Sequence, residues 1–212
     1  MKEEQQIIVK AARLVCENGQ IFKGKVFANG HDCFGELIFN TAMAGYEEVL
    51  TDPSYKEQIV LMTYPLIGSY GINEQDVQSS SLHLKALCVK EYIQYPSNWR
   101  SNKTLKQYLE EHEILGVEGL DTRAITRSLR HLGAMKSMLT TSTEPDDILV
   151  EKVKNYEGLE GKDLASIVST KKAYEWVKPQ IEKYKVAVID CGVKYSILNQ
   201  LVNNNCSVTV FP

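Results

Sequence analysis

The sequence predicts an α/β protein that has one complete domain followed by the beginning of a second. Three observations carry this prediction. Residues 13–92 contain short apolar runs separated by turn residues, which is typical of β-strands. Residues 104–156 contain segments that begin with residues favoured at helix N-termini. Residues 185–211 then have the pattern strand, helix, strand, which opens a doubly wound parallel sheet.

The strands of the first part are placed by turn chemistry and by buried apolar runs. Asn18-Gly19 lies between two apolar-rich runs in residues 13–27 and predicts a β-hairpin, because this dipeptide readily takes the positive φ angles of a tight turn. Further strands are expected at residues 35–39, 58–63 and 84–92. A short helix is expected at residues 46–50, and the turn residues Asp52-Pro53-Ser54 end it.

Two helices with clear end signals are expected in the middle of the chain. The first, at residues 104–112, begins with Thr104 as its N-cap. The second, at residues 121–131, begins with Asp121 and ends before Gly133, a residue type favoured just after a helix. The apolar residues of this second helix are expected to share one face: Ala124, Ile125, Leu129 and Leu132.

A third helix and a connector complete the expected order. In residues 143–156, Thr143 with Asp146 fits a capping box, and Pro145 is suited to the first turn. The expected boundaries are a polar lead-in at 1–11, the first domain at 12–157, a connector at 158–184 and the start of the second domain at 185–212. Because a lone strand–helix–strand unit cannot cover both faces of its sheet, we expect exposed apolar surface at Val186, Val188, Val208 and Val210.

Composition narrows the class of protein. The formal net charge is -3, from 24 Lys+Arg and 27 Asp+Glu, so neither nucleic acid nor an anionic membrane is expected as a partner. Apolar runs are too short to span a bilayer, and the N-terminus does not resemble a signal peptide. The 5 cysteines include no CxxC pair, and the 4 histidines are scattered. We therefore expect reduced thiols in a cytoplasmic protein, without a structural zinc site or disulfide framework.

Cys191 is the first candidate for chemistry, because it follows a buried strand and precedes Gly192 and a helix. The nucleophile-elbow pattern is absent around it, and no histidine follows it in the chain, so a packed thiol at a strand end is the favoured interpretation. The loop from Asp190 to Lys194 is also a weak candidate for binding an anion at a helix N-terminus.

Two further motifs have a structural and a functional interpretation. In the turn Asp52-Pro53-Ser54-Tyr55, the polar side chains are expected first of all to bond the turn backbone. Arg123, Arg127 and Arg130 form a basic helix face, which is either solvated or a docking surface for an acidic partner. Taken alone, the residues of these motifs show no arrangement of catalytic side chains.

Four collinear motifs resemble the small subunit of carbamoyl phosphate synthetase. The longest runs from Gly35 to Gly71 and contains Asn40-Thr41-Ala42-Met43-Ala44-Gly45-Tyr46 and Thr51-Asp52-Pro53-Ser54-Tyr55. The others are Gly119-Leu120-Asp121-Thr122-Arg123-Ala124-Ile125-Thr126, Gly161-Lys162-Asp163-Leu164-Ala165 and Val188-Ile189-Asp190-Cys191-Gly192-Val193-Lys194-Tyr195. The resemblance extends from about residue 12 to the end of the sequence.

The resemblance implies a fold and an activity. It implies an N-terminal domain of the swivelling β/β/α type followed by a class I glutamine amidotransferase domain. That domain hydrolyses glutamine through a Cys-His-Glu triad, and the ammonia travels to a large subunit that makes carbamoyl phosphate for pyrimidine and arginine biosynthesis. The implied partners are this large subunit and glutamine. No cofactor is expected in this chain, since the large subunit uses the ATP, Mg and bicarbonate.

Only one site residue carries over by position. Ser54 matches a family residue that contacts bound glutamine from the N-terminal domain. The triad residues lie beyond Pro212 in the family's order, so Cys191 is not the family nucleophile and the 212 residues alone are expected to be inactive. Two alternatives remain: a non-catalytic family member that acts only as a docking domain, and an independent hydrolase that uses Cys191.

Overall fold

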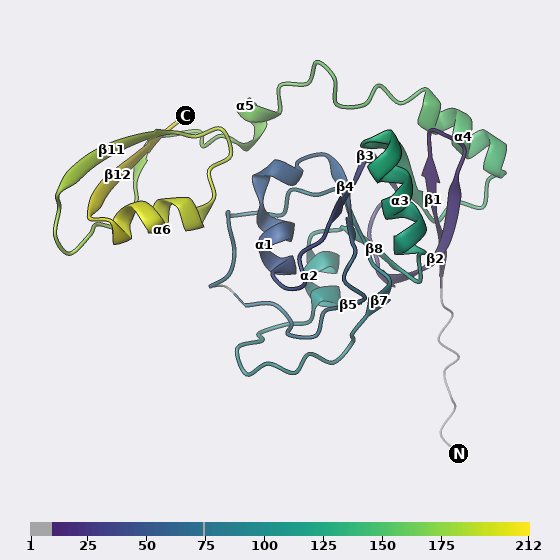
Figure 1. Cartoon of the computed structure of the whole chain (residues 1–212), viewed down its shortest axis with the longest axis horizontal. Coiled ribbons are helices and arrows are strands. Elements are labelled where there is room, and N and C mark those ends of the chain that lie inside the picture. Colours follow the sequence, from purple (N-terminus) through teal and green to yellow (C-terminus); the bar gives the residue numbers. More distant parts are fainter. Residues whose placement is uncertain (1–9, 74) are drawn as a thin grey trace.

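A closed β-barrel forms the first part of the protein in the computed structural model, which describes residues 10–73 and 75–212 (Figure 1). Its strands follow the order β1-β2-β8-β6-β4-β3-β9 around the barrel. Their bounds are β1 (Ala11–Cys16), β2 (Ile21–Ala28), β3 (Cys33–Asn40), β4 (Gln58–Met62), β6 (Ala86–Cys88), β8 (Leu115–Glu118) and β9 (Met135–Thr140). The expected mixed α/β character is confirmed, and closure of the sheet is a finding of the structure.

The barrel mixes local and long-range pairing. β1 and β2 form the expected hairpin, with Gly19 at a φ of 85° in its turn. β3, β4, β6 and β8 pair in parallel, and β9 closes the barrel by pairing antiparallel with both β1 and β3. Alternate residues of each strand point inward, so the barrel has a continuous apolar core that includes Leu14, Leu37, Ile59, Leu61, Cys88, Val117 and Leu139.

Four helices pack on the barrel. α1 (Tyr46–Thr51) and α2 (Leu105–Glu111) share an outer apolar cluster with β4 and β6. α3 (Thr122–Leu132) contributes Ile125 and Leu129 to the core cluster of the barrel. α4 (Asp146–Lys154) packs against β1 and β9. No helix within residues 10–73 and 75–212 has the length and apolar character to cross a membrane.

The helix ends confirm two of the expected caps and correct a third. Thr104 and Gln107 form a full capping box, and the carboxylate of Asp121 accepts the N–H of Ala124. The expected capping box at the third helix is wrong, because α4 begins at Asp146 without a side-chain cap. The Asp146 carboxylate pairs instead with Arg13 of β1, so a tertiary contact replaces the local one.

Two of the apolar residues expected on the buried face of α3 are exposed. Ile125 and Leu129 are buried as expected, whereas Leu132 is 64% exposed and Ala124 is also exposed. Leu132 is the last residue of α3, and Ala124 lies away from the face that carries Ile125 and Leu129. Thr122 takes the remaining buried position of this face.

The single strand expected at residues 84–92 is two strands. β6 belongs to the barrel, whereas β7 (Glu91–Tyr92) pairs in parallel with β5 (Leu66–Ile67) in a separate two-stranded sheet. The chain therefore leaves the barrel after Val89, whose N–H donates to the carbonyl of Val117.

The C-terminal part forms a three-stranded sheet. β11 (Tyr184–Ile189) and β12 (Cys206–Phe211) are parallel, and α6 (Tyr195–Asn203) connects them, as the strand–helix–strand pattern predicts. The segment expected as a connector contains α5 (Leu164–Val168) and β10 (Tyr174–Glu175). β10 pairs antiparallel with β12, which gives the order β10-β12-β11.

The exposed apolar face of this sheet is not the one expected. Val208 and Val210 are buried, and Val186 and Val188 pack with them in the cluster under α6. The opposite face is the open one, with Ile189 at 66% and Phe211 at 39% exposure. Side chains alternate along a strand, so α6 covers the valines and leaves their neighbours uncovered.

Candidate functional site

The turn that carries Ser54 is shaped by its own first residue. Asp52 follows α1, and its Oδ1 accepts the N–H of Ser54 at 2.9 Å. Pro53 begins the short 3-10 helix of the turn and is buried, whereas Ser54 is exposed. Among the described residues, nothing bonds the Ser54 hydroxyl. The turn therefore presents this hydroxyl outward and leaves it available to a ligand.

A second loop, from Asp190 to Lys194, is closed around the carboxylate of Asp190. Its Oδ1 accepts the N–H groups of Gly192 at 2.9 Å and Val193 at 2.8 Å, and its Oδ2 accepts the N–H of Thr170 at 2.7 Å. The backbone N–H groups of Gly192 and Val193 are thus already bonded to a carboxylate. These bonds count against an anion site in this loop, which stays a prediction.

The Cys191 thiol is exposed, and the prediction of a packed thiol at this strand end is wrong. Asp190 turns inward to close the loop, and the next side chain is directed outward. The hollow beside Cys191 is lined by Ser166, Ser169, Lys171 and other residues that include no histidine. The described residues of this hollow therefore offer Cys191 no histidine as a general base.

The two loops lie against each other. Lys194 Nζ is 3.2 Å from Asp52 Oδ2, so the carboxylate that shapes the Ser54 turn also pairs with the second loop. A Cβ added at Gly192 would be 3.0 Å from the Cβ of Pro53 and 3.0 Å from Cγ2 of Val168. Glycine permits this close approach, and it also permits the φ of 97° found at this position.

Gln78 makes a second connection between the barrel and the C-terminal part. Its backbone carbonyl accepts the N–H of Tyr195 at 2.9 Å, and its side-chain oxygen accepts the N–H of Ser196 at 3.2 Å. Its own N–H donates to Oγ1 of Thr51, the last residue of α1, at 2.8 Å. Gln78 therefore holds the first turn of α6 close to the end of α1, where the Ser54 turn begins.

A polar cavity of about 380 Å³ lies between the two parts. Its lining includes Pro53, His83, Thr170, Tyr195 and the hydroxyls of Ser79, Ser80 and Ser81. Burial, together with the nearby Lys56, lowers the pKa of the His83 imidazole below its ordinary value, although Asp52 acts in the opposite direction. His83 Nε2 is 2.9 Å from the Ser79 hydroxyl. The cavity thus holds a neutral hydrogen-bonding imidazole near pH 7.

The basic face of α3 is exposed and borders a groove. Arg123, Arg127 and Arg130 are exposed. They line a groove of about 270 Å³ together with Thr63, Thr122 and Thr126. No carboxylate lines this groove, so the alternative of a docking surface stays open.

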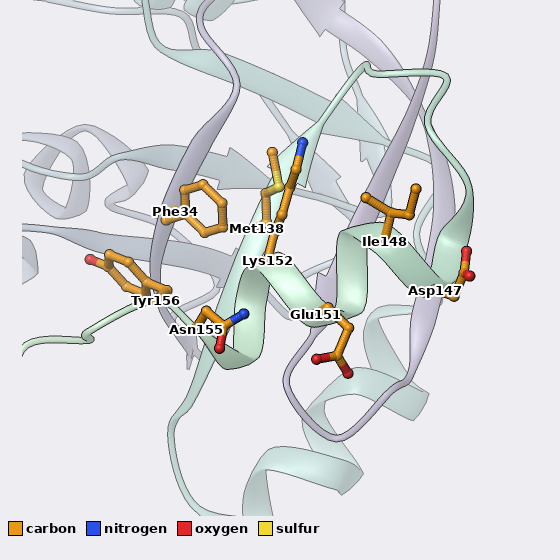
Figure 2. Close-up of a pocket in the computed structure, with 8 residues that line it drawn as sticks. All are labelled: Phe34, Met138, Asp147, Ile148, Glu151, Lys152, Asn155 and Tyr156. Carbon is orange, nitrogen blue, oxygen red and sulfur yellow. The ribbon is translucent and has the colours of Figure 1, made fainter.

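A larger pocket, of about 730 Å³, lies beside α4 and contains none of the predicted site residues (Figure 2). The rings of Phe34 and Tyr156 stack with centroids 5.3 Å apart at one end, and Met138 lies beside them. Glu151 and Asp147 stand on the α4 side. Among the described residues, no cluster of three or more His, Cys, Asp or Glu side chains could hold a metal ion.

Comparison with known proteins decides the family. Residues 14–139 match the family model described as carbamoyl-phosphate synthase small chain, CPSase domain. The chain is 46% identical over 202 residues to a carbamoyl phosphate synthase small chain of Clostridium perfringens, covering 95% of this chain and 56% of that protein. The proteins of the same name from Aquifex aeolicus and Thermotoga maritima are 41% and 43% identical, and each alignment covers 96% of this chain.

This chain belongs to the carbamoyl-phosphate synthase small chain family. It spans 56%, 58% and 51% of the lengths of the three relatives from Clostridium, Aquifex and Thermotoga. The family match contains five of the seven barrel strands whole, most of β9, half of β1 and the Ser54 turn, and it ends before the C-terminal sheet. The role of Ser54 stays a prediction, since no contact of its hydroxyl is seen.

Sequence reasoning found Ser54 and the Asp190–Lys194 loop but missed the contacts that join them. Asp52 and Lys194 are 142 positions apart in the sequence, and no local pattern predicts such a contact. Gln78 lies in a polar loop without helix or strand periodicity. These contacts follow from the proximity of the two motifs in space, which the sequence alone does not show.

Proposed function

We propose that this chain is the N-terminal part of the glutaminase subunit of glutamine-dependent carbamoyl phosphate synthetase. The subunit would hydrolyse glutamine and supply ammonia to a large synthetase subunit for pyrimidine and arginine biosynthesis. Family membership and the names of the relatives support this proposal. ATP, Mg and bicarbonate would be used by the large subunit, and no cofactor is proposed for this chain.

The observation that carries the proposal is the packing of the Ser54 turn on the Asp190–Lys194 loop. We assign β11, α6 and β12 to the start of the glutamine amidotransferase domain. The Asp52–Lys194 pair and the bonds of Gln78 then hold Ser54 at the boundary between the barrel and that domain. An exposed hydroxyl at such a boundary is suited to bind glutamine held mainly by the second domain.

Ser54 would act as a binding residue and not as a nucleophile. A serine hydroxyl both donates and accepts, so it fits either the amino acid moiety or the side-chain amide of glutamine. The hydrogen bond between Ser54 and glutamine would be present both in the ground state and in the transition state. Such uniform binding lowers KM with little effect on kcat.

The test is Ser54→Ala in the glutaminase subunit that contains this chain, assembled with its synthetase subunit. Loss of one hydrogen bond in a buried complex costs on the order of 1 kcal/mol or more, so KM for glutamine should rise about fivefold or more. The turn should keep its shape, because Asp52 bonds the backbone of Ser54 and not its hydroxyl.

Ser97→Ala is the matched control, since it removes another exposed serine hydroxyl from a loop of the same barrel. We expect the control to leave KM and kcat unchanged. An unchanged KM in Ser54→Ala would refute the role given to Ser54.

A further inference from the structure

Three arginines of α3 form one outward stripe. Arg123, Arg127 and Arg130 are separated by four and three positions, which places them along one side of the helix. Ile125 and Leu129, on the opposite side, are buried in the barrel cluster. In Figure 1, α3 lies in front of the barrel strands, and no other helix covers it. The stripe is therefore open to a partner.

No acidic side chain of the described residues pairs with these arginines. Arg13 and Arg100, in contrast, pair with Asp146 and Asp76. Acids are not scarce in a chain with 27 Asp+Glu and 24 Lys+Arg. Like charges at helical spacing repel, so a cluster of this kind gains stability when a partner supplies carboxylates.

Exposed apolar side chains follow one wall residue of the basic groove in the chain. Thr63 lies in the groove wall, and the chain continues from it into Tyr64, which is 36% exposed, and Leu66, which is 41% exposed. Arginine and tyrosine are enriched at the energetic centres of protein interfaces, and neighbouring apolar contacts exclude water there. We call the set Tyr64, Leu66, Arg123, Arg127 and Arg130 the α3 surface.

The dimensions and charges of the α3 surface favour a protein as its occupant. Its groove of about 270 Å³ is smaller than the roughly 300–1,000 Å³ of typical small-molecule sites. A nucleic acid is disfavoured by the net charge of -3. Three guanidinium groups line a groove with Thr63, and the chain leads from Thr63 into exposed Tyr64 and Leu66. This combination matches a protein surface that presents carboxylates next to an apolar contact.

We infer that the α3 surface is the docking site for an acidic, partly apolar patch on the synthetase subunit. This inference rests on the proposed function, which supplies the partner. It goes further by naming the side of the barrel that the partner covers and the chemistry of the patch that fits it.

The experiment uses the glutaminase subunit that contains this chain and the isolated synthetase subunit. The triple variant Arg123→Glu, Arg127→Glu, Arg130→Glu should raise the Kd of the complex by at least about tenfold, because it places like charges face to face. The binding of the wild-type protein should weaken with added salt, and this dependence should be reduced in the variant. Calorimetric titration at two salt concentrations measures both effects.

The control is Lys10→Glu, Lys23→Glu, Lys25→Glu, which makes the same change in net charge on exposed lysines of the β1–β2 hairpin region. Circular dichroism and thermal unfolding check that each variant is folded. If the glutamate variant does not fold, the triple alanine variant replaces it, with a smaller rise in Kd expected.

The outcomes separate the inference from the function on which it rests. Weak binding in the arginine variant with normal binding in the lysine control supports the docking site. Equal binding in the arginine variant and the wild-type protein overturns the docking site and leaves the proposed function intact. If the wild-type protein does not bind the synthetase subunit, the proposed function itself fails. Arginine-dependent binding of inorganic phosphate below millimolar concentration would identify a small-anion site and overturn the inference.

Discussion

Glu47 is a fully buried carboxylate in α1, one helix turn from the Ser54 motif. Both of its oxygens accept the N–H of Asn73, at 3.1 and 3.0 Å. Burial raises the pKa of Glu47 to about 7, and nearby Asp76 and Glu48 act in the same direction. The backbone bond from Asn73 and the charge of Arg100 lower this pKa only in part.

This shift predicts a pH-dependent stability. The folded-state pKa of Glu47 lies above its reference value of 4.5, so the folded protein binds the proton more tightly than the unfolded chain does. The free energy of unfolding should therefore fall as pH rises from about 5 to 8, by up to about 3 kcal/mol. The lowered pKa of His83 acts in the opposite direction below its reference value of 6.5.

Glu47→Gln isolates this contribution. Urea unfolding at several pH values should show a variant that becomes more stable relative to the wild-type protein as pH rises. Glu48→Gln on the same helix serves as the comparison. The same trend in Glu48→Gln would show that burial of Glu47 is not its cause.

At the scale of single residues, the sequence identified motifs better than side-chain directions. The sequence placed Cys191 at a strand end and predicted that its thiol is packed, whereas the thiol is exposed in the structure. The direction depends on Asp190, whose carboxylate folds the loop by accepting three backbone N–H groups. Residue types alone do not show whether such a carboxylate bonds its own loop or a ligand.

The helix ends show that local sequence patterns are also limited in predicting whole elements. Thr104 and Thr143 both begin segments with capping signals, but only Thr104 forms a capping box. The cap expected at Thr143 depended on Asp146, which pairs with Arg13. A local signal therefore predicts a cap only when no distant side chain offers its residues a better partner.

Paired substitutions test this difference. Thr104→Ala should lower the free energy of unfolding by about 1 kcal/mol, because the N–H of Gln107 loses its acceptor. Thr143→Ala should change it by much less, because its hydroxyl caps no helix. Chemical denaturation of both variants measures the difference, and equal losses would contradict the capping pattern of the structure.

For the molecule as a whole, local patterns predicted most elements but not the closure of the barrel. The hairpin, β3, β4 and the C-terminal strand–helix–strand follow from turns and apolar runs. β8 and β9 were missed, because Leu115–Glu118 is short and polar residues interrupt Met135–Thr140. Closure requires β9 to pair with β1, more than a hundred positions away, and no local pattern encodes that pairing.

The most direct test of the central claim is the nitrogen source used by the assembled synthetase. Carbamoyl phosphate formation should be measured with glutamine and with ammonia, in the presence and absence of the subunit that contains this chain. We predict that ammonia supports synthesis in both cases, and that glutamine supports it only when the subunit is present. If glutamine fails as a nitrogen source even with the subunit bound, the protein is not a glutaminase subunit and the account is contradicted.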